Sequence, residues 1–168
     1  DTPVHVVDMA SIFYAAWHAG AGDNINHAAD VTLRRVRAIR DVSGAHVIVC
    51  ADAPGKKWRH DLDSEYKANR EAPDPALVTQ LVRCQELLGA DGFHVLKAQG
   101  FEADDVIATM VRWLSELGTG AVVVSDDKDL AQLVKPGVMM YRPREDREQD
   151  LRAGFYRSAD VERKWGVM

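Results

Sequence analysis

Residues 121–129 read AVVVSDDKD, an apolar run that ends in a cluster of acidic side chains. Four consecutive apolar residues before a polar turn are typical of a strand that is buried on both faces of a sheet. Similar runs recur along the chain, and we expect each of them to form a strand. They are residues 4–7, 46–51, 93–96 and 138–141.

Helical patterns alternate with these strands. The helical segments carry apolar residues at the spacing of one buried helix face. We expect Asp30 to be the N-cap of the second helix. Strands that alternate with helices predict an α/β domain with a mainly parallel sheet. The expected helices are residues 11–19, 30–41, 77–88, 102–117 and a last stretch from about 158.

The composition suits one domain of 168 residues, with a formal charge of −5 from 21 basic and 26 acidic residues. This balance does not favour DNA binding by bulk charge, so the distribution of the basic residues matters more. Residues 142–157 mix basic side chains with four acids. A more strongly basic group lies in one short segment and comprises Lys56, Lys57, Arg59, Lys67 and Arg70.

The chain has no apolar run long enough to cross a bilayer and does not open on a signal-peptide pattern, so we expect a cytoplasmic protein without a membrane segment. Its two cysteines, Cys50 and Cys84, stand among apolar neighbours. We expect reduced thiols in the core, because neither a disulfide nor a metal-ligand pattern is present.

Acidic residues follow four of the expected strands, just past their carboxyl ends. Ligands of an open parallel sheet bind at that edge, so these side chains should converge there. A single acid after a strand is usually a helix cap or a loop residue, but four strand ends that share the feature are harder to explain in that way. The residues are Asp8, Asp52, Glu102, Asp104, Asp105, Asp127 and Asp129.

Several carboxylates in one cleft need a counter-charge. Two unit charges ~5 Å apart repel by roughly 3 kcal/mol at an effective dielectric constant of about 20. Helix N-termini and raised pKa values relieve part of this repulsion, and bound cations can relieve the rest. A ligand set made of oxygen atoms, without His or Cys, favours Mg²⁺ or Mn²⁺ over Zn²⁺.

Three ordered motifs carry a resemblance to a known family. Residues 100–108, GFEADDVIA, resemble the G-x-E-A-D-D-x-I-A signature of the flap endonuclease and 5′→3′ exonuclease family. Residues 124–130, VSDDKDL, resemble its S-G-D-K-D-L motif, with Asp126 in place of the small residue. Residues 65–70, EYKANR, match the Y-K-A-N-R segment of its helical arch. The family includes the N-terminal domain of bacterial DNA polymerase I and stand-alone bacterial and phage enzymes.

The resemblance implies a three-layer α/β/α PIN-like core over residues 1–168, with an inserted helical arch at about 54–75. It also implies a structure-selective nuclease that uses two Mg²⁺ or Mn²⁺ ions. Such an enzyme hydrolyses DNA phosphodiester bonds at 5′ flaps or 5′ ends and leaves a 5′-phosphate and a 3′-hydroxyl. We expect DNA with a 5′ single strand as the partner and a monomeric protein.

The resemblance also assigns roles to residues. Lys67 and Arg70 would act on the scissile phosphate. Asp127 and Asp129 would help to hold the second ion. Apart from the resemblance, the aromatic rings of Tyr14 and Trp58 could stack on bases, a contact worth roughly 1–3 kcal/mol each. The first ion would be held by Asp8, Asp52, Glu102, Asp104, Asp105 and Asp127, and further DNA contacts would come from Lys56, Lys57 and Arg59.

Two departures from the family pattern qualify these expectations. Ala15 stands where the family usually has Arg, which removes one phosphate contact. The chain also ends before the two further aspartates and the helical DNA-binding motif of the family, so we expect a partial core with an incomplete second metal site.

Two alternatives stay open at the level of sequence, and a phosphatase is disfavoured. A PIN-type ribonuclease shares the acidic cleft but normally lacks an inserted arch, so the segment 54–72 discriminates against it. A phosphatase with an aspartyl nucleophile would need a second Asp two residues after Asp8, where this chain has Ala10. A fragment that binds DNA without cutting it is the non-enzymatic alternative.

Overall fold

A computed structural model describes residues 2–20, 26–66, 72–148 and 150–166. Its sheet has six strands in the order β3-β2-β1-β4-β5-β6. The first five pair in parallel, and β6 runs antiparallel to β5. The strands are β1 (Val4–Asp8), β2 (Val47–Cys50), β3 (His94–Leu96), β4 (Ala121–Val124), β5 (Val138–Tyr141) and β6 (Phe155–Tyr156).

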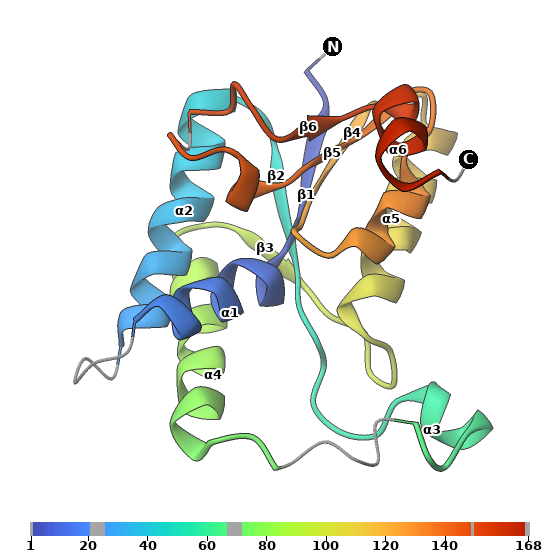
Figure 1. The fold of residues 1–168 in the computed structure, drawn as a ribbon. Coiled ribbons are helices and arrows are strands. Elements are labelled where there is room, and N and C mark those ends of the chain that lie inside the picture. The colour runs from blue at the N-terminus through green and yellow to red at the C-terminus, as the bar shows by residue number, and fades with distance from the viewer. Residues whose placement is uncertain (1, 21–25, 67–71, 149, 167–168) are drawn as a thin grey trace.

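Helices cover both faces of this sheet (Figure 1). Helices α1 (Met9–Ala19), α2 (His27–Ser43) and α4 (Pro75–Ala90) lie on one side, and α5 (Ala103–Glu116) and α6 (Ser158–Trp165) lie on the other. Helix α3 (Trp58–Leu62) projects from the body near the N-terminal end of α5. Two 3₁₀ helices, η1 (Lys128–Leu133) and η2 (Pro143–Glu145), follow β4 and β5.

The central strands feed two separate cores because their side chains alternate between the two faces. Val7 and Val124 belong to the core under α1, α2 and α4. Their neighbours Val6 and Val123 belong to the core under α5. All four side chains are fully buried. The expected α/β class, with a mainly parallel sheet between two helical layers, is therefore confirmed.

The predicted start of α2 was wrong. The helix begins at His27, and Asp30 lies in its first turn rather than at its N-cap. Gln80 of α4 supplies the missing acceptor, because its Oε1 takes hydrogen bonds from the N–H groups of Ala28 (3.0 Å) and Ala29 (3.3 Å). The helix can therefore start earlier than its own sequence indicates. Strand β6 was not predicted either, since a two-residue strand has too few residues for a recognisable pattern.

The two cysteines are free and buried, as expected. Burial raises the pKa of the Cys50 thiol and of the Cys84 thiol to about 12 each, so both stay protonated at neutral pH. Among the described residues, no helix combines the length and the apolar character that a bilayer crossing requires.

Candidate active site

A cavity of about 330 Å³ opens where β1, β2 and β4 end. Five of the seven acids that the sequence placed at this edge line it together. Asp105 and Asp129 are the two that do not. The lining residues are Asp8, Ala10, Ser11, Tyr14, Asp52, Glu102, Ala103, Asp104, Asp126, Asp127 and Arg144, and we call this space the acidic cavity.

Asp8 lies at the inner end of the acidic cavity. It is the last residue of β1 and also the N-cap of α1, where its Oδ1 accepts a hydrogen bond of 3.2 Å from the N–H of Ser11. Burial raises the pKa of Asp8 to about 6. The hydrogen bonds from Ser125 and Ser11 oppose that rise, whereas the carboxylates of Asp104 and Asp52 add to it. This carboxylate is therefore held where its negative charge is costly.

The turn after β4 is tied to the start of α1 through two serines. Ser125 is fully buried and donates from its Oγ to Oδ2 of Asp8 over 2.7 Å. The same Oγ accepts the N–H of Asp127 over 3.0 Å. From the other side, Oγ of Ser11 accepts the N–H of Asp126 over 2.8 Å. These bonds fix Asp8 and Asp127 relative to each other.

The start of α5 forms the opposite wall. Oδ1 of Asp52 accepts the N–H of Ala103 over 2.9 Å, so the end of β2 caps this helix. Glu102 is the N-cap residue of α5 and is mostly buried. The hydroxyl of Tyr66 donates to Oε2 of Glu102 over 3.1 Å. A residue of the inserted segment thus contacts an acid of the cavity directly.

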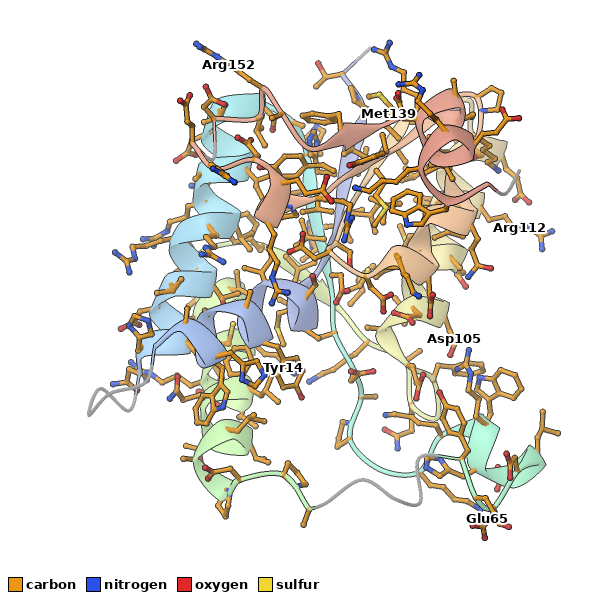
Figure 2. The ribbon with its side chains drawn as sticks, viewed as in Figure 1. Tyr14, Glu65, Asp105, Arg112, Met139 and Arg152 are labelled. Atoms are coloured by element: carbon orange, nitrogen blue, oxygen red, sulfur yellow. The ribbon has the colours of Figure 1, made fainter. Side chains whose placement is uncertain are left out.

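Asp105 faces α3 instead of the acidic cavity (Figure 2). The guanidinium of Arg59 donates to both of its carboxylate oxygens, over 2.6 and 2.8 Å, and Nε1 of Trp58 donates over 3.3 Å. The Arg59 guanidinium holds the pKa of Asp105 below its usual range. It also lies 3.6 Å from Oε2 of Glu102. Arg59 therefore supplies positive charge to both of these acids.

Asp129 lies in the first turn of η1, outside the acidic cavity. Its N–H donates to Oδ1 of Asp127 over 2.9 Å, which makes Asp127 the cap of that helix. Asp129 lines a neighbouring groove between η1 and α6, together with Lys128. The two aspartates that were expected to share the second ion therefore line different spaces.

The residues expected to contact DNA are distributed unevenly. Tyr14 lines the acidic cavity, and Trp58 is partly exposed on α3 with Arg59 packed over its ring at 4.7 Å. Lys57 is buried, with its Nζ bonded to the carbonyl of Ala53. Lys56 forms an exposed ion pair with Asp61. Lys67 and Arg70, the two expected catalytic residues, lie outside the described residues.

Three polar lining residues were absent from the sequence-based set, namely Ser11, Asp126 and Arg144. So was Ser125, which bonds to Asp8 but does not line the cavity. Asp126 could have been found, because it stands in the same acidic cluster as Asp127. Burial raises its pKa, although Oδ1 accepts the N–H of Arg144 over 3.0 Å. The guanidinium of Arg144 lies 3.8 Å from Oδ2. Arg144 gave no signal, since only the path of the chain after β5 brings it here.

The donor set of the acidic cavity fits a hard divalent cation. Carboxylates and hydroxyls supply oxygen ligands. The pKa of Asp8 is raised mainly by burial and further by the charges of Asp104 and Asp52, and a cation would offset both effects. Among the residues that the structure describes, no three His, Cys, Asp or Glu side chains are already arranged to hold a metal ion. Mg²⁺ commonly keeps several of its waters when a protein binds it.

The fold and this edge of acids together define an α/β domain of the 5′-nuclease type. T5 5′-exonuclease, solved with zinc ions bound, superimposes with a TM-score of 0.74 and 19% identity over 98% of this chain and 61% of that chain. The catalytic core of Rad2, solved with a DNA substrate, gives a TM-score of 0.57 and 16% identity over 99% of this chain and 50% of that chain. These likenesses show the shared fold.

Residues 3–166 match the family of 5′-3′ exonucleases through its N-terminal resolvase-like domain, and the chain belongs to this family. DNA polymerase I of Rhizobium leguminosarum is 41% identical over 75% of this chain, which spans 12% of that protein. Flap endonuclease Xni of Shewanella denitrificans is 36% identical over 74% of this chain and 50% of its own length. The chain thus spans half or less of these relatives.

Proposed function

We propose that this chain is the catalytic core of a metal-dependent 5′-nuclease that hydrolyses DNA phosphodiester bonds at 5′ flaps or 5′ ends, leaving a 5′-phosphate and a 3′-hydroxyl. The observation that carries the proposal is the gathering of acids from separate strand ends in one acidic cavity. Its relatives support it, because they include the 5′-3′ exonuclease of Aquifex aeolicus and Flap endonuclease Xni.

Two Mg²⁺ or Mn²⁺ ions are the proposed cofactors. When bound, such ions supply an activated water, neutralise the phosphate and stabilise the leaving oxygen. Asp105 would join the first site after exchanging Arg59 for a cation, and Asp129 would reach the second ion beside Asp127. The remaining ligands of the first ion are Asp8, Asp52, Glu102, Asp104 and Asp127.

The residues of the chain would position the DNA around these ions. Tyr14 offers a ring on which a base can stack beside the scissile bond. Lys67 and Arg70 would orient the diester and stabilise the negative charge that grows in the transition state. Ser125 and Ser11 keep Asp8 fixed, so that its oxygens need no rearrangement when a cation arrives.

The test uses a 5′-flap DNA labelled at its 5′ end, incubated with the protein in Mg²⁺, in Mn²⁺ and in EDTA. We expect metal-dependent release of the flap by the wild type and a loss of at least a hundredfold in Asp127→Asn, with DNA binding largely kept. Asp41→Asn is the matched control, because Asp41 lies on the exposed side of α2 and pairs only with Arg40 among the described residues.

Two further outcomes separate the alternatives. Cleavage of the matching RNA flap in preference to the DNA flap would favour a PIN-type ribonuclease. Tight binding of the DNA flap without cleavage under either metal would favour a fragment that binds DNA without cutting. Full metal-dependent activity in Asp127→Asn would remove Asp127 from the proposed ligands.

A further inference from the structure

A second cavity, of about 240 Å³, lies beside the acidic cavity. Three arginines from two separate parts of the chain line it: Arg35 of α2, and Arg144 and Arg147 of the segment between β5 and β6. Arg144 lines both cavities, so they share a wall. Ala15 of α1 leaves room between these side chains because its own side chain is a single methyl group. The remaining lining residues are Pro143 and Asp146.

Among the described residues, these arginines form no close ion pair with an acid of the protein. On α2, Arg37 and Arg40 pair with Asp91, whereas no ion pair joins Arg35 to an acid within the described residues. Arg147 likewise forms no ion pair with any acid in the described part of the chain. Arg144 reaches Asp126 only at 3.8 Å, and most of its side chain is exposed.

The acids nearby are engaged elsewhere. Glu145 receives the side chains of Arg142 and Lys164. Asp146, which lines the cavity, is 2% exposed, and its Oδ2 accepts the Tyr141 hydroxyl (2.9 Å) and the Leu151 N–H (2.8 Å). Asp146 is the one carboxylate among the described residues that line this cavity, and it is buried and already hydrogen bonded.

We infer that Arg35, Arg144 and Arg147 form a phosphate-binding site that holds the DNA strand next to the acidic cavity. Guanidinium groups donate paired hydrogen bonds that match the oxygens of a phosphate. This inference rests on the proposed function. A cavity lined by carboxylates repels the phosphates of DNA, and the positive charge of the three arginines would offset that repulsion. A phosphate held at the shared wall would fix the register of the strand over the acids.

The phosphate could be an internal diester of the flap or the 5′-terminal monoester. Flap oligonucleotides that carry one neutral methylphosphonate at a single linkage near the junction test the diester. Oligonucleotides with a 5′-phosphate or a 5′-hydroxyl test the monoester. Binding is measured in EDTA and in Mg²⁺ with Asp127→Asn as the background, so that the DNA stays intact.

The variants are Arg35→Gln/Arg147→Gln, which removes charge, and Ala15→Leu, which fills the cavity and keeps all three arginines. Arg34→Gln/Arg152→Gln is the matched control: Arg34 is exposed on the same helix, and Arg152 is an exposed residue at the upper end of the view, away from Tyr14 (Figure 2). Circular dichroism and thermal melting verify that each variant is folded.

We expect Arg35→Gln/Arg147→Gln and Ala15→Leu to bind the unmodified flap about tenfold more weakly, and the control to change less than twofold. The slope of log K against log salt should fall by about 0.7 to 0.9 for the one phosphate lost. For one of the modified oligonucleotides, the protein with all three arginines should also bind about tenfold more weakly than it binds the unmodified flap. The affinity of Arg35→Gln/Arg147→Gln should not fall further with that oligonucleotide.

Equal loss in the control pair would overturn the inference, since it would reduce the effect to bulk charge. The inference would also be overturned if, for every modified linkage and for the 5′ end, the affinity loss from the DNA modification simply added to the loss from Arg35→Gln/Arg147→Gln. If the surface binds no flap DNA at all, the proposed function fails together with the inference. If the protein binds flap DNA and, with Asp127 intact, cuts it in Mg²⁺, while Arg35→Gln/Arg147→Gln and Ala15→Leu leave binding and its salt dependence unchanged, only the inference fails.

Discussion

Ser125 donates a hydrogen bond of 2.7 Å to Oδ2 of Asp8, and the two residues are 117 positions apart in the chain. The bond joins the ends of β1 and β4, which are neighbours in the sheet. Because Ser125 also accepts the N–H of Asp127, one buried hydroxyl fixes two of the acids proposed to bind metal. Ser125 therefore influences the acidic cavity through the positions and the charge of its neighbours.

Replacing this hydroxyl should change the pH dependence of metal binding. In Ser125→Ala, Asp8 loses a hydrogen bond that lowers its pKa, so the pKa should rise above about 6. Binding of Mg²⁺, followed by calorimetry across pH 5–8, should then begin at a higher pH than in the wild type. The lost bonds should also cost about 1–2 kcal/mol of folding stability.

Ser115→Ala is the control for that experiment, because Ser115 makes a comparable hydrogen bond to the carbonyl of Val111 on α5. An identical pH midpoint in Ser125→Ala and Ser115→Ala would show that the hydroxyl does not set the charge state of Asp8.

The raised pKa of Asp8 predicts how stability depends on pH without divalent ions. Burial raises it from 3.8 to about 6, so the folded state binds a proton that the unfolded state has released. The resulting stabilisation is complete below about pH 4 and is lost as pH rises through about 6. For the full shift it is roughly 3 kcal/mol.

Urea unfolding of the wild type and of Asp8→Asn in EDTA measures this. The difference in unfolding free energy between them should fall from pH 4 to pH 7, and Mg²⁺ should restore stability at pH 7 more in the wild type than in Asp8→Asn. Parallel pH profiles for the two proteins would show that Asp8 ionises in the folded state at its ordinary pKa.

Arg59→Gln should loosen α3. It removes two charge-assisted hydrogen bonds to Asp105, and the pKa of Asp105 should rise towards its usual value. Hydrogen exchange at the amides of Trp58 and Asp63 should accelerate about fivefold or more. Lys56→Gln is the matched control: its ion pair with Asp61 is two-thirds exposed, and such pairs contribute little. Equal acceleration in both variants would contradict the anchoring role of Arg59.

Lys67→Ala should slow cleavage of a 5′-flap DNA by about a hundredfold or more, because a positive charge on the scissile phosphate is worth most in the transition state. Single-turnover rates measure this effect, and calorimetry should find Mg²⁺ affinity nearly unchanged. Lys97→Ala, which removes a lysine bonded to Gln85, is the control. A large loss of Mg²⁺ affinity in Lys67→Ala would move its role from the substrate to the metal site.

The sequence predicted the parts of the fold that depend on local patterns. Apolar runs such as residues 121–124 identify strands because a buried strand needs no partner sequence to be recognised. The shared edge of a parallel sheet then places acids such as Asp8 and Asp127 in one cavity, although they are far apart in the chain. The convergence of these acids could be expected mainly because the alternation of strands and helices indicated a parallel sheet.

The rest depends on contacts between distant segments, which no local pattern encodes. Gln80 completes the start of α2 from 52 positions away, so the cap expected at Asp30 was wrong. Arg59 turns Asp105 away from the acidic cavity across 46 positions. Arg144 enters the cavity wall through an irregular segment after β5. Each of these contacts joins segments that are far apart in the sequence, and only the folded chain brings them together.

The segment between β2 and α4 is attached to the loop before α5 near its start, and it ends at the cap of α4. The N–H of Trp58 donates to the carbonyl of Gly100 over 2.8 Å, and Asp74 caps α4 by accepting the N–H of Ala76 over 2.8 Å. Between these points, Arg59 bonds to Asp105 and the Tyr66 hydroxyl bonds to Glu102, so the segment also contacts two acids at the start of α5. An insertion or deletion between Trp58 and Tyr66 would therefore be transmitted to Glu102, an acid that lines the cavity.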